Sequence, residues 1–119
     1  MLPNNLLVVN RGEIAIRVMR AAAELGVPTV AVFSEDDAQS LHTRKADDVR
    51  ALQGKGAAAY LDVEQLIAVA RASGCDAIHP GYGFLSENAA FARRCTEARI
   101  TFVGPRAEVL DLFGDKVRA

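Results

Sequence analysis

Two short loops combine glycine with polar side chains at positions where a ligand could bind. Asn10-Arg11-Gly12-Glu13 follows the apolar run 6–9, and Gly81-Tyr82-Gly83-Phe84 follows the run 76–79. Ligands of open parallel sheets bind beyond the carboxyl ends of the strands. The first loop also leads into a predicted helix, whose N-terminus can bind an anion. These two loops are therefore the candidate binding site.

The common nucleotide-binding motifs do not match these loops. A dinucleotide fingerprint needs three spaced glycines, whereas the first loop has only Gly12 and sets Glu13 where a pyrophosphate would lie. Glu35 stands near the distance of a ribose-binding acid, but acidic turns are common after any strand. Gly54-Lys55-Gly56 lacks the phosphate-loop pattern and is interpreted as a flexible loop. Classical NAD binding is therefore not favoured.

Catalytic and metal-binding patterns are also sparse. The chain has no Gly-x-Ser-x-Gly sequence, and Cys75 and His79 lack partners at zinc-binding spacing. His79 precedes Pro80 at the end of a predicted strand. We interpret it as a hydrogen-bonded, partly buried histidine rather than as a general base. No catalytic residue and no metal ligand are assigned.

The composition is that of an ordinary soluble domain. The 119 residues have a mass of 12.7 kDa, and 14 Lys and Arg against 15 Asp and Glu give a net charge of −1. Half of the residues are apolar, which excludes disordered and collagen-like chains. Basic residues do not cluster, so neither a nucleic acid nor a membrane is the expected partner.

Targeting features and cysteine pairing are not indicated. The apolar run at the N-terminus is too short for a signal peptide, and no run approaches the length of a membrane span. Cys75 and Cys95 are isolated, which argues against a disulfide scaffold. We therefore predict a cytoplasmic protein, or one in another reducing, soluble compartment.

Short apolar runs alternate with segments of helical periodicity along the chain. This alternation predicts an α/β fold, a Rossmann-like three-layer domain with a mainly parallel sheet of about five strands. Asp62, three residues before Gln65, is the predicted cap of the second helix. The expected strands are 6–9, 29–33, 48–52, 76–79 and 100–103, and the expected helices are 13–25, 62–73, 88–98 and 106–113, with a Gly/Ala-rich loop at 53–59.

The first predicted helix has an apolar and a charged face. Its apolar stripe, expected to face the core, consists of Ile14, Val18, Ala21 and Leu25. The other face carries Arg17, Arg20 and Glu24. Arg20 and Glu24 are spaced as an i,i+4 pair, in the order that supports a helix less well. This face is either solvated or an interface.

The two loops carry a resemblance to a known family. Residues 10–15 (NRGEIA) and 79–88 (HPGYGFLSEN) closely resemble the N-terminal domain of biotin carboxylase, the first, pre-ATP-grasp lobe of the ATP-grasp enzymes. Gly104-Pro105 and Gly114-Asp115-Lys116-Val117 follow in the family's order. The resemblance covers essentially the whole chain. It implies a domain at residues 1–114 and, at 115–119, the start of a linker into an ATP-grasp domain.

The resemblance implies a ligase activity in a longer chain. Enzymes of this family phosphorylate bicarbonate with ATP and transfer the carboxyl group to biotin, and Mg²⁺ offsets the phosphate charge. They include acetyl-, propionyl- and acyl-CoA, pyruvate and urea carboxylases. The expected partners are the ATP-grasp and C-terminal lobes of the same chain, a biotin carrier domain and a second copy in a homodimer. The 119 residues alone are expected to be inactive and to bind no cofactor tightly.

The resemblance also implies roles for individual residues. Lys116 matches a lysine that contacts ATP, and Tyr82 and Gly83 match the wall of the biotin pocket. Arg20 and Glu24 match positions at the homodimer contact. The residues expected to shape the site, without taking part in chemistry, are Asn10, Arg11, Gly12, Glu13, His79, Gly81, Glu87 and Asn88.

Alternatives of other classes stay open at this point. They are the first lobe of an ATP-grasp ligase of the carbamoyl-phosphate type, a non-catalytic Rossmann-like assembly module, and a free-standing nucleotide-binding protein. The run 79–88 favours biotin chemistry over the first of these. Residues 42–59 look closer to multidomain acyl-CoA or urea carboxylases than to the stand-alone bacterial enzyme. The carboxyl acceptor is therefore left open.

Overall fold

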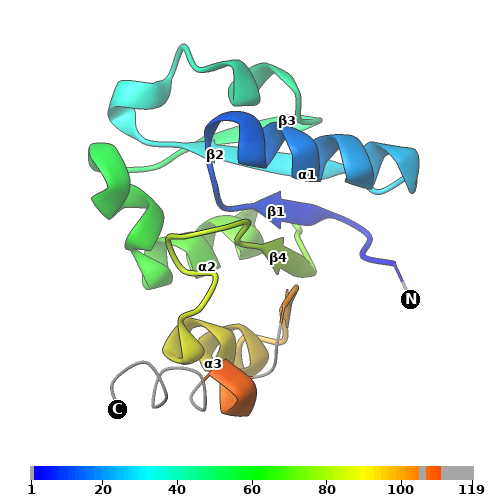
Figure 1. The fold of residues 1–119 in the computed structure, drawn as a ribbon, viewed down its shortest axis with the longest axis vertical. Helices are drawn as coiled ribbons and strands as arrows, with labels where there is room; N and C mark the ends of the chain where they lie inside the picture. The colour runs from blue at the N-terminus through cyan, green and yellow to red at the C-terminus, as the bar shows by residue number, and fades with distance from the viewer. Residues whose placement is uncertain (1, 105–106, 111–119) are drawn as a thin grey trace.

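A single parallel sheet organises the chain. The computed structural model describes residues 2–104 and 107–110 (Figure 1). All strand pairs are parallel, in the order β3-β2-β1-β4-β5, and Leu7 at the centre pairs with Val30 and Ile78. The strands are β1 (Leu6–Val8), β2 (Thr29–Phe33), β3 (Asp48–Ala51), β4 (Ala77–His79) and β5 (Thr101–Phe102). The predicted α/β fold with about five strands is confirmed.

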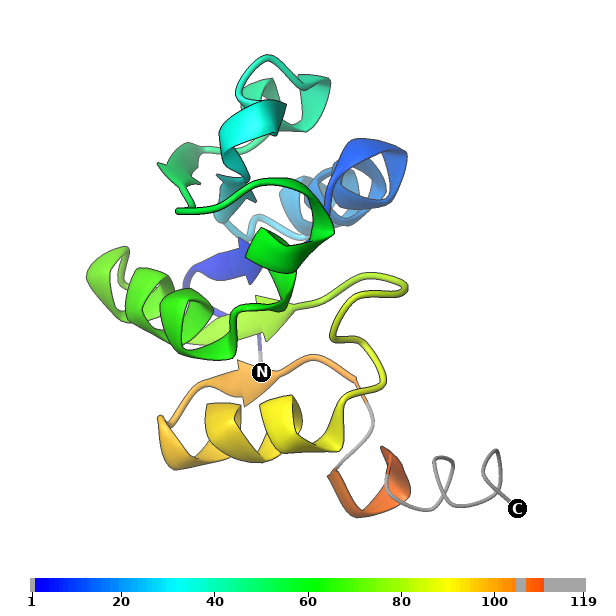
Figure 2. The same cartoon turned by 90° about the vertical axis from the view of Figure 1, so that its left-hand side faces the viewer.

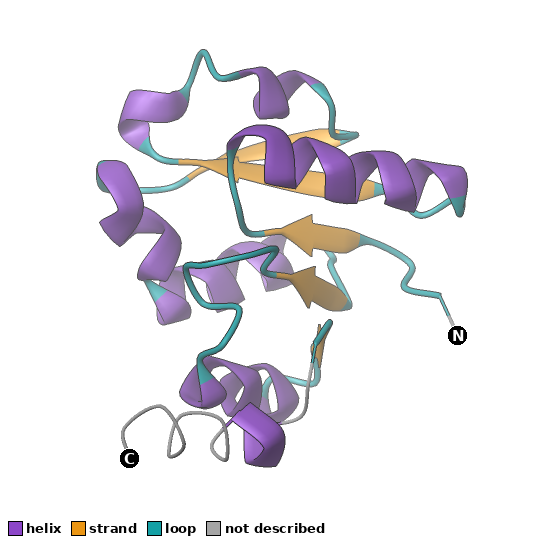
Figure 3. Cartoon of the chain, viewed as in Figure 1, coloured by secondary structure: helices purple, strands orange, loops and turns teal. Residues whose placement is uncertain are grey.

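Helices cover both faces of this sheet. α1 (Gly12–Glu24) lies on one face, whereas α2 (Val63–Ala72) and α3 (Ala89–Glu97) lie on the other (Figures 2 and 3). Three short 3-10 helices join these elements, η1 (Glu35–Asp37), η2 (Leu41–Arg44) and η3 (Gly56–Leu61). The predicted helix at 106–113 is helical at 107–110, and its other residues lie outside the described ones. The three layers agree with the predicted architecture.

Two helix starts have side-chain caps. Asp62 accepts a hydrogen bond from the backbone nitrogen of Gln65 at 3.2 Å, as its spacing predicts. Asn88 accepts one from the backbone nitrogen of Phe91 at 2.9 Å and so begins α3. Asn88, one of the residues expected to shape the site, thus fixes where the second loop ends.

The larger core lies between the sheet and the helices α2 and α3. Leu7 and Ile78 are fully buried there, together with Leu66 and Phe91 from the helices. A smaller cluster joins the opposite face of the sheet to α1 and includes Val8. Burial of the central strand on both faces explains why its sequence is apolar throughout.

The prediction of which face of α1 is buried is wrong. The buried residues of α1 are Ala15, Met19 and Ala22, one position along from the predicted set. The predicted stripe instead lines a surface groove of about 490 Å³, and Leu25 is 61% exposed. Ala15, Met19 and Ala22 pack against the sheet in the smaller core cluster. The described helices α2 and α3 lie on the other face, so the β4–β5 half of the sheet stays open beside α1.

Residues 53–61 also differ from the prediction. They were expected to form a loop as far as residue 59, but Gly56–Leu61 forms η3 and buries Ala59 and Tyr60. Tyr60 is fully buried although it follows a run of small residues. Local sequence does not reveal this burial, because the partners of Tyr60 lie elsewhere in the chain.

No helix in the described ranges 2–104 and 107–110 is long and apolar enough to cross a membrane.

Paired leucine substitutions test the corrected burial of α1. We expect Leu7→Ala to lower the free energy of unfolding by about 2–5 kcal/mol, because it opens a cavity in the core. Leu25→Ala should change this free energy by no more than about 0.5 kcal/mol, because the side chain is exposed. Urea unfolding of both variants provides the measurement. If Leu25→Ala lowered the free energy of unfolding as much as Leu7→Ala, the face of α1 predicted from the sequence would be the buried one.

Candidate functional site

The loops that follow β1 and β4 are joined by the side chain of Asn10. Its Nδ2 donates to the carbonyl oxygens of Pro80 at 2.8 Å and Tyr82 at 2.7 Å. Its Oδ1 accepts from the backbone nitrogen of Arg11 at 2.9 Å. Asn10 is 2% exposed, so these bonds replace its contacts with water. The structure thus brings the two predicted loops together.

Gly81 lies against Asn10 and cannot carry a side chain. Its φ is +67°, and a Cβ atom there would lie 2.7 Å from Asn10 Nδ2 and 2.9 Å from Ile14 Cγ2. Its backbone nitrogen donates to Nδ1 of His79 at 3.0 Å. Burial lowers the pKa of His79, and an Nδ1 that accepts a hydrogen bond belongs to the neutral ring. His79 is therefore hydrogen-bonded and partly buried, as interpreted from the sequence.

The positive charge of Arg11 is paired with a carboxylate of the same chain. Its Nε and Nη2 each lie 2.7 Å from a carboxylate oxygen of Asp37, forming a two-pronged ion pair. The hydroxyls of Tyr60 and Ser40 also donate to this carboxylate, at 2.7 and 3.1 Å. The hydrogen bonds from Arg11 hold the pKa of Asp37 well below its usual range. The sequence analysis did not single out Asp37 or Tyr60.

Glu13 and Arg17 form the ion pair of α1. Glu13 Oε1 lies 2.8 Å from Arg17 Nη2, and both side chains are largely exposed. This order, with the acid first, supports a helix better than the reverse. Arg20 and Glu24 are exposed and, although both are described, they form no ion pair with each other, so the predicted i,i+4 pair is wrong. Gly12 begins α1 at a φ of +62°.

Tyr82 and Gly83 form the exposed part of the second loop. Tyr82 is 78% exposed, although its carbonyl is held by Asn10. Glu87 is also exposed. Phe84, by contrast, stacks on Tyr60 with ring centroids 5.1 Å apart. The loop therefore leaves the ring of Tyr82 exposed, whereas its backbone is held by Asn10.

The backbone amides of both glycines in the segment Gly54-Lys55-Gly56 are already hydrogen-bonded. The backbone nitrogen of Gly54 donates to Glu35 Oε2 at 2.6 Å, and that of Gly56 donates to Asp36 Oδ1 at 2.9 Å. These carboxylates take the amides that a phosphate would need. The segment is fixed to η1 by these bonds rather than being the flexible loop that we expected.

The described residues contain no group of three or more His, Cys, Asp or Glu that could hold a metal ion. Cys75 and Cys95 are free and buried. Burial raises the pKa of both thiols, that of Cys95 to about 11, so both are protonated at neutral pH. Lys116, expected to contact ATP, and the domain boundary expected at residue 114 lie outside the described residues.

Removal of the Asp37 charge should make the free energy of unfolding less dependent on pH under acidic conditions. The folded state lowers the pKa of Asp37, so it binds fewer protons than the unfolded state, and the stabilisation is lost as the pH falls below about 4. We expect Asp37→Asn to lower the free energy of unfolding by about 1–3 kcal/mol at pH 7. Between pH 5 and 3, at roughly the ordinary Asp pKa, wild type should lose more stability than the variant.

Chemical unfolding at several pH values measures this difference. Asp48→Asn is the matched control, because Asp48 pairs with Arg50 at the exposed edge of the sheet at 3.1 Å. The control should keep the acid dependence of wild type. Parallel acid profiles for wild type and Asp37→Asn would contradict the assignment.

Comparison with known proteins gives the family. A sequence model of the family described as "Biotin carboxylase, N-terminal domain" matches residues 3–110. Pyruvate carboxylase of Staphylococcus aureus is 59% identical over 117 residues, which cover 96% of this chain and 10% of that protein. Biotin carboxylase 1 of Bacillus subtilis is 51% identical over 112 residues, which cover 93% of this chain and 25% of that protein.

Solved structures agree with this assignment. The biotin carboxylase domain of a single-chain bacterial carboxylase has a TM-score of 0.93 at 56% identity and covers 96% of this chain and 27% of that chain. A single-chain, multi-domain long-chain acyl-CoA carboxylase has a TM-score of 0.92 at 56% identity, over 93% of this chain and 11% of that chain. The chain thus spans about a tenth to a quarter of the length of these relatives. It belongs to the biotin carboxylase N-terminal domain family, as the loops at residues 10–15 and 79–88 indicated.

Proposed function

We propose that this chain is the first lobe of the biotin carboxylase part of a longer, biotin-dependent carboxylase. The full-length protein would be an ATP-dependent ligase that carboxylates biotin with bicarbonate. The observation that carries this proposal is the loop at residues 79–88, which matches the family and is held at the carboxyl edge of the sheet by Asn10. The same loop favours biotin over carbamoyl-phosphate chemistry.

In this proposal the lobe supplies one wall of the site. Tyr82 and Gly83 would line the biotin pocket, since they are exposed on a loop whose backbone is fixed. Lys116 would contact ATP where the chain leads into the ATP-grasp lobe. Asn10, Gly12 and the other signature residues would shape the loops without contact with the reacting atoms.

The reacting groups would come from the other lobes of the full-length protein. Bicarbonate is phosphorylated by ATP, and carboxyphosphate then provides the carboxyl group for a ureido nitrogen of biotin. Mg²⁺ bound with ATP would offset the phosphate charge. Arg11, the cation of the first loop, is already paired with Asp37. We therefore expect the isolated 119 residues to show no turnover and no tight binding of ATP, Mg²⁺ or biotin.

Assembly and location form part of the same proposal. Arg20 and Glu24 are exposed on α1 and carry charges that no partner within the described chain neutralises, which suits a homodimer contact. A biotin carrier domain would deliver biotin to Tyr82. Two free, buried cysteines suit a reducing compartment such as the cytoplasm. Relatives are named pyruvate, long-chain acyl-CoA and 2-oxoglutarate carboxylases, so the proposal extends to the carboxylation of biotin and not to one acceptor.

Substitutions of Lys116 and Tyr82 should separate the two substrates. In the full-length protein we expect Lys116→Gln to raise KM for MgATP about tenfold or more and to leave KM for free biotin unchanged. Tyr82→Ala should have the opposite pattern. Biotin-dependent ADP release is the measurement, and Lys45→Gln, at an exposed lysine away from both loops, is the control. ADP release by the isolated 119 residues would contradict the proposal.

Self-association should depend on the charge of α1. We expect Arg20→Glu to shift the full-length protein toward monomer in sedimentation velocity, because it places like charges at the proposed contact. Arg17→Glu, at the cation already paired with Glu13, is the comparison variant and should act more weakly. If Arg20→Glu sedimented like wild type, the proposal that α1 forms the dimer contact would be contradicted.

A further inference from the structure

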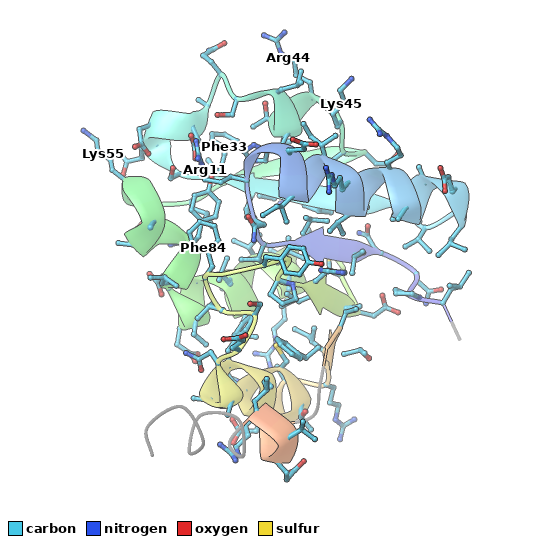
Figure 4. All side chains as sticks on the ribbon, viewed as in Figure 1. Arg11, Phe33, Arg44, Lys45, Lys55 and Phe84 are labelled. Atoms are coloured by element: carbon cyan, nitrogen blue, oxygen red, sulfur yellow. The ribbon has the colours of Figure 1, made fainter. Side chains whose placement is uncertain are left out.

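Tyr60 lies between the two loops of the site, because it binds Asp37, the partner of Arg11, and stacks on Phe84 of the second loop. It lies in η3 and is fully buried. Its hydroxyl donates to Asp37 Oδ2 at 2.7 Å and accepts from the backbone nitrogen of Ser34 at 3.2 Å. Its ring stacks on Phe84 with centroids 5.1 Å apart and planes at 28°. Arg11, which Asp37 holds, and Phe84 lie on the same side of the molecule (Figure 4).

The hydroxyl end of Tyr60 leads to the first loop by direct hydrogen bonds. Asp37 holds the guanidinium of Arg11 through two bonds of 2.7 Å, and this fixes the residue that follows Asn10. Asn10 in turn holds the carbonyls of Pro80 and Tyr82. A group that positions Arg11 therefore also positions the backbone of Tyr82.

The ring end of Tyr60 acts on the second loop directly. Phe84 has a φ of +45°, in the left-handed region that residues with a side chain rarely adopt. Such a conformation persists only where the surroundings hold it. Phe84 is held by the stack on Tyr60 and by its neighbour Leu85, which is 2% exposed. The stack therefore fixes the chain two residues beyond Tyr82.

We infer that Tyr60 is a positioning residue that holds the loop at residues 80–84 from both ends, through Asp37 and Arg11 on one side and through Phe84 on the other. It does not touch substrate. This inference rests on the proposed function, in which the exposed ring of Tyr82 and the backbone of Gly83 line the biotin pocket. Tyr60 would thus affect the affinity for biotin indirectly, because it holds the loop that lines the pocket.

Two substitutions separate the two ends of Tyr60. Tyr60→Phe keeps a ring to stack on Phe84 and removes only the hydroxyl that Asp37 and Ser34 bind. Phe84→Leu keeps the hydroxyl network and removes the stack. Val27→Ala is the control for lost stability, because Val27 is buried in the other core cluster, just before β2 begins at Thr29.

The first experiment measures hydrogen–deuterium exchange in the full-length protein, on a peptide that covers residues 79–86. We expect Tyr60→Phe and Phe84→Leu each to speed exchange about tenfold, because each releases one end of the loop. Val27→Ala should leave this peptide close to wild type. Unchanged exchange in Tyr60→Phe, or equal acceleration in Val27→Ala, would overturn the inference.

The second experiment measures KM and kcat for biotin-dependent ADP release. We expect Tyr60→Phe to raise KM for free biotin about tenfold and to leave KM for MgATP within about twofold. A purely structural loss would lower kcat through the active fraction and leave both KM values unchanged, which would overturn the link to biotin. If wild type itself shows no biotin-dependent ADP release, the proposed function fails, and exchange alone decides whether Tyr60 positions the loop.

Discussion

The buried amide of Asn10 is the interaction on which the arrangement of the loops depends. A side-chain amide removed from water must find partners for its donors and its acceptor. Here the nitrogen binds two carbonyls of the second loop, and the oxygen binds the backbone of the first. Gly81 follows from this geometry, because a Cβ atom would collide with the same amide. The two sequence runs that indicated the family are thus parts of one packed contact.

Charges near the loops are compensated within the chain. Arg11 is paired with Asp37, and Glu35 and Asp36 occupy the amides around Lys55. The cation of the first loop is thus already paired, and the second loop presents the exposed ring of Tyr82. Such a surface suits the proposed role of a lobe that completes a pocket.

Local patterns predicted much of this fold, and long-range contacts account for what they missed. Strands, caps and the two loops follow from periodicity and spacing within a few residues, as Asp62 with Gln65 illustrates. The burial of Tyr60 depends on Asp37 and Phe84, which lie 23 residues before it and 24 residues after it. An isolated aromatic residue in a Gly/Ala-rich segment is a signal that could have found it.

The stripe on α1 failed for a different reason. Periodicity identifies an apolar face, but it cannot say whether the sheet or an open groove lies opposite. In α1, Ala15, Met19 and Ala22 pack on the sheet, whereas Ile14, Val18, Ala21 and Leu25 line the groove. Both faces carry apolar side chains, so periodicity alone did not decide which of them faces the sheet.

The order of the strands has a consequence for biosynthesis. β1 is central and pairs with β2 directly and with β4, whose partners for Leu6 and Val8 are Ala77 and His79. A ribosome adds roughly 5–20 residues per second, so one edge of β1 waits several seconds for β4. Until then a nascent chain exposes an apolar strand edge, the kind of surface that chaperones bind. The central strand β1 is therefore synthesised first, but both of its edges are paired only after β4 has been synthesised.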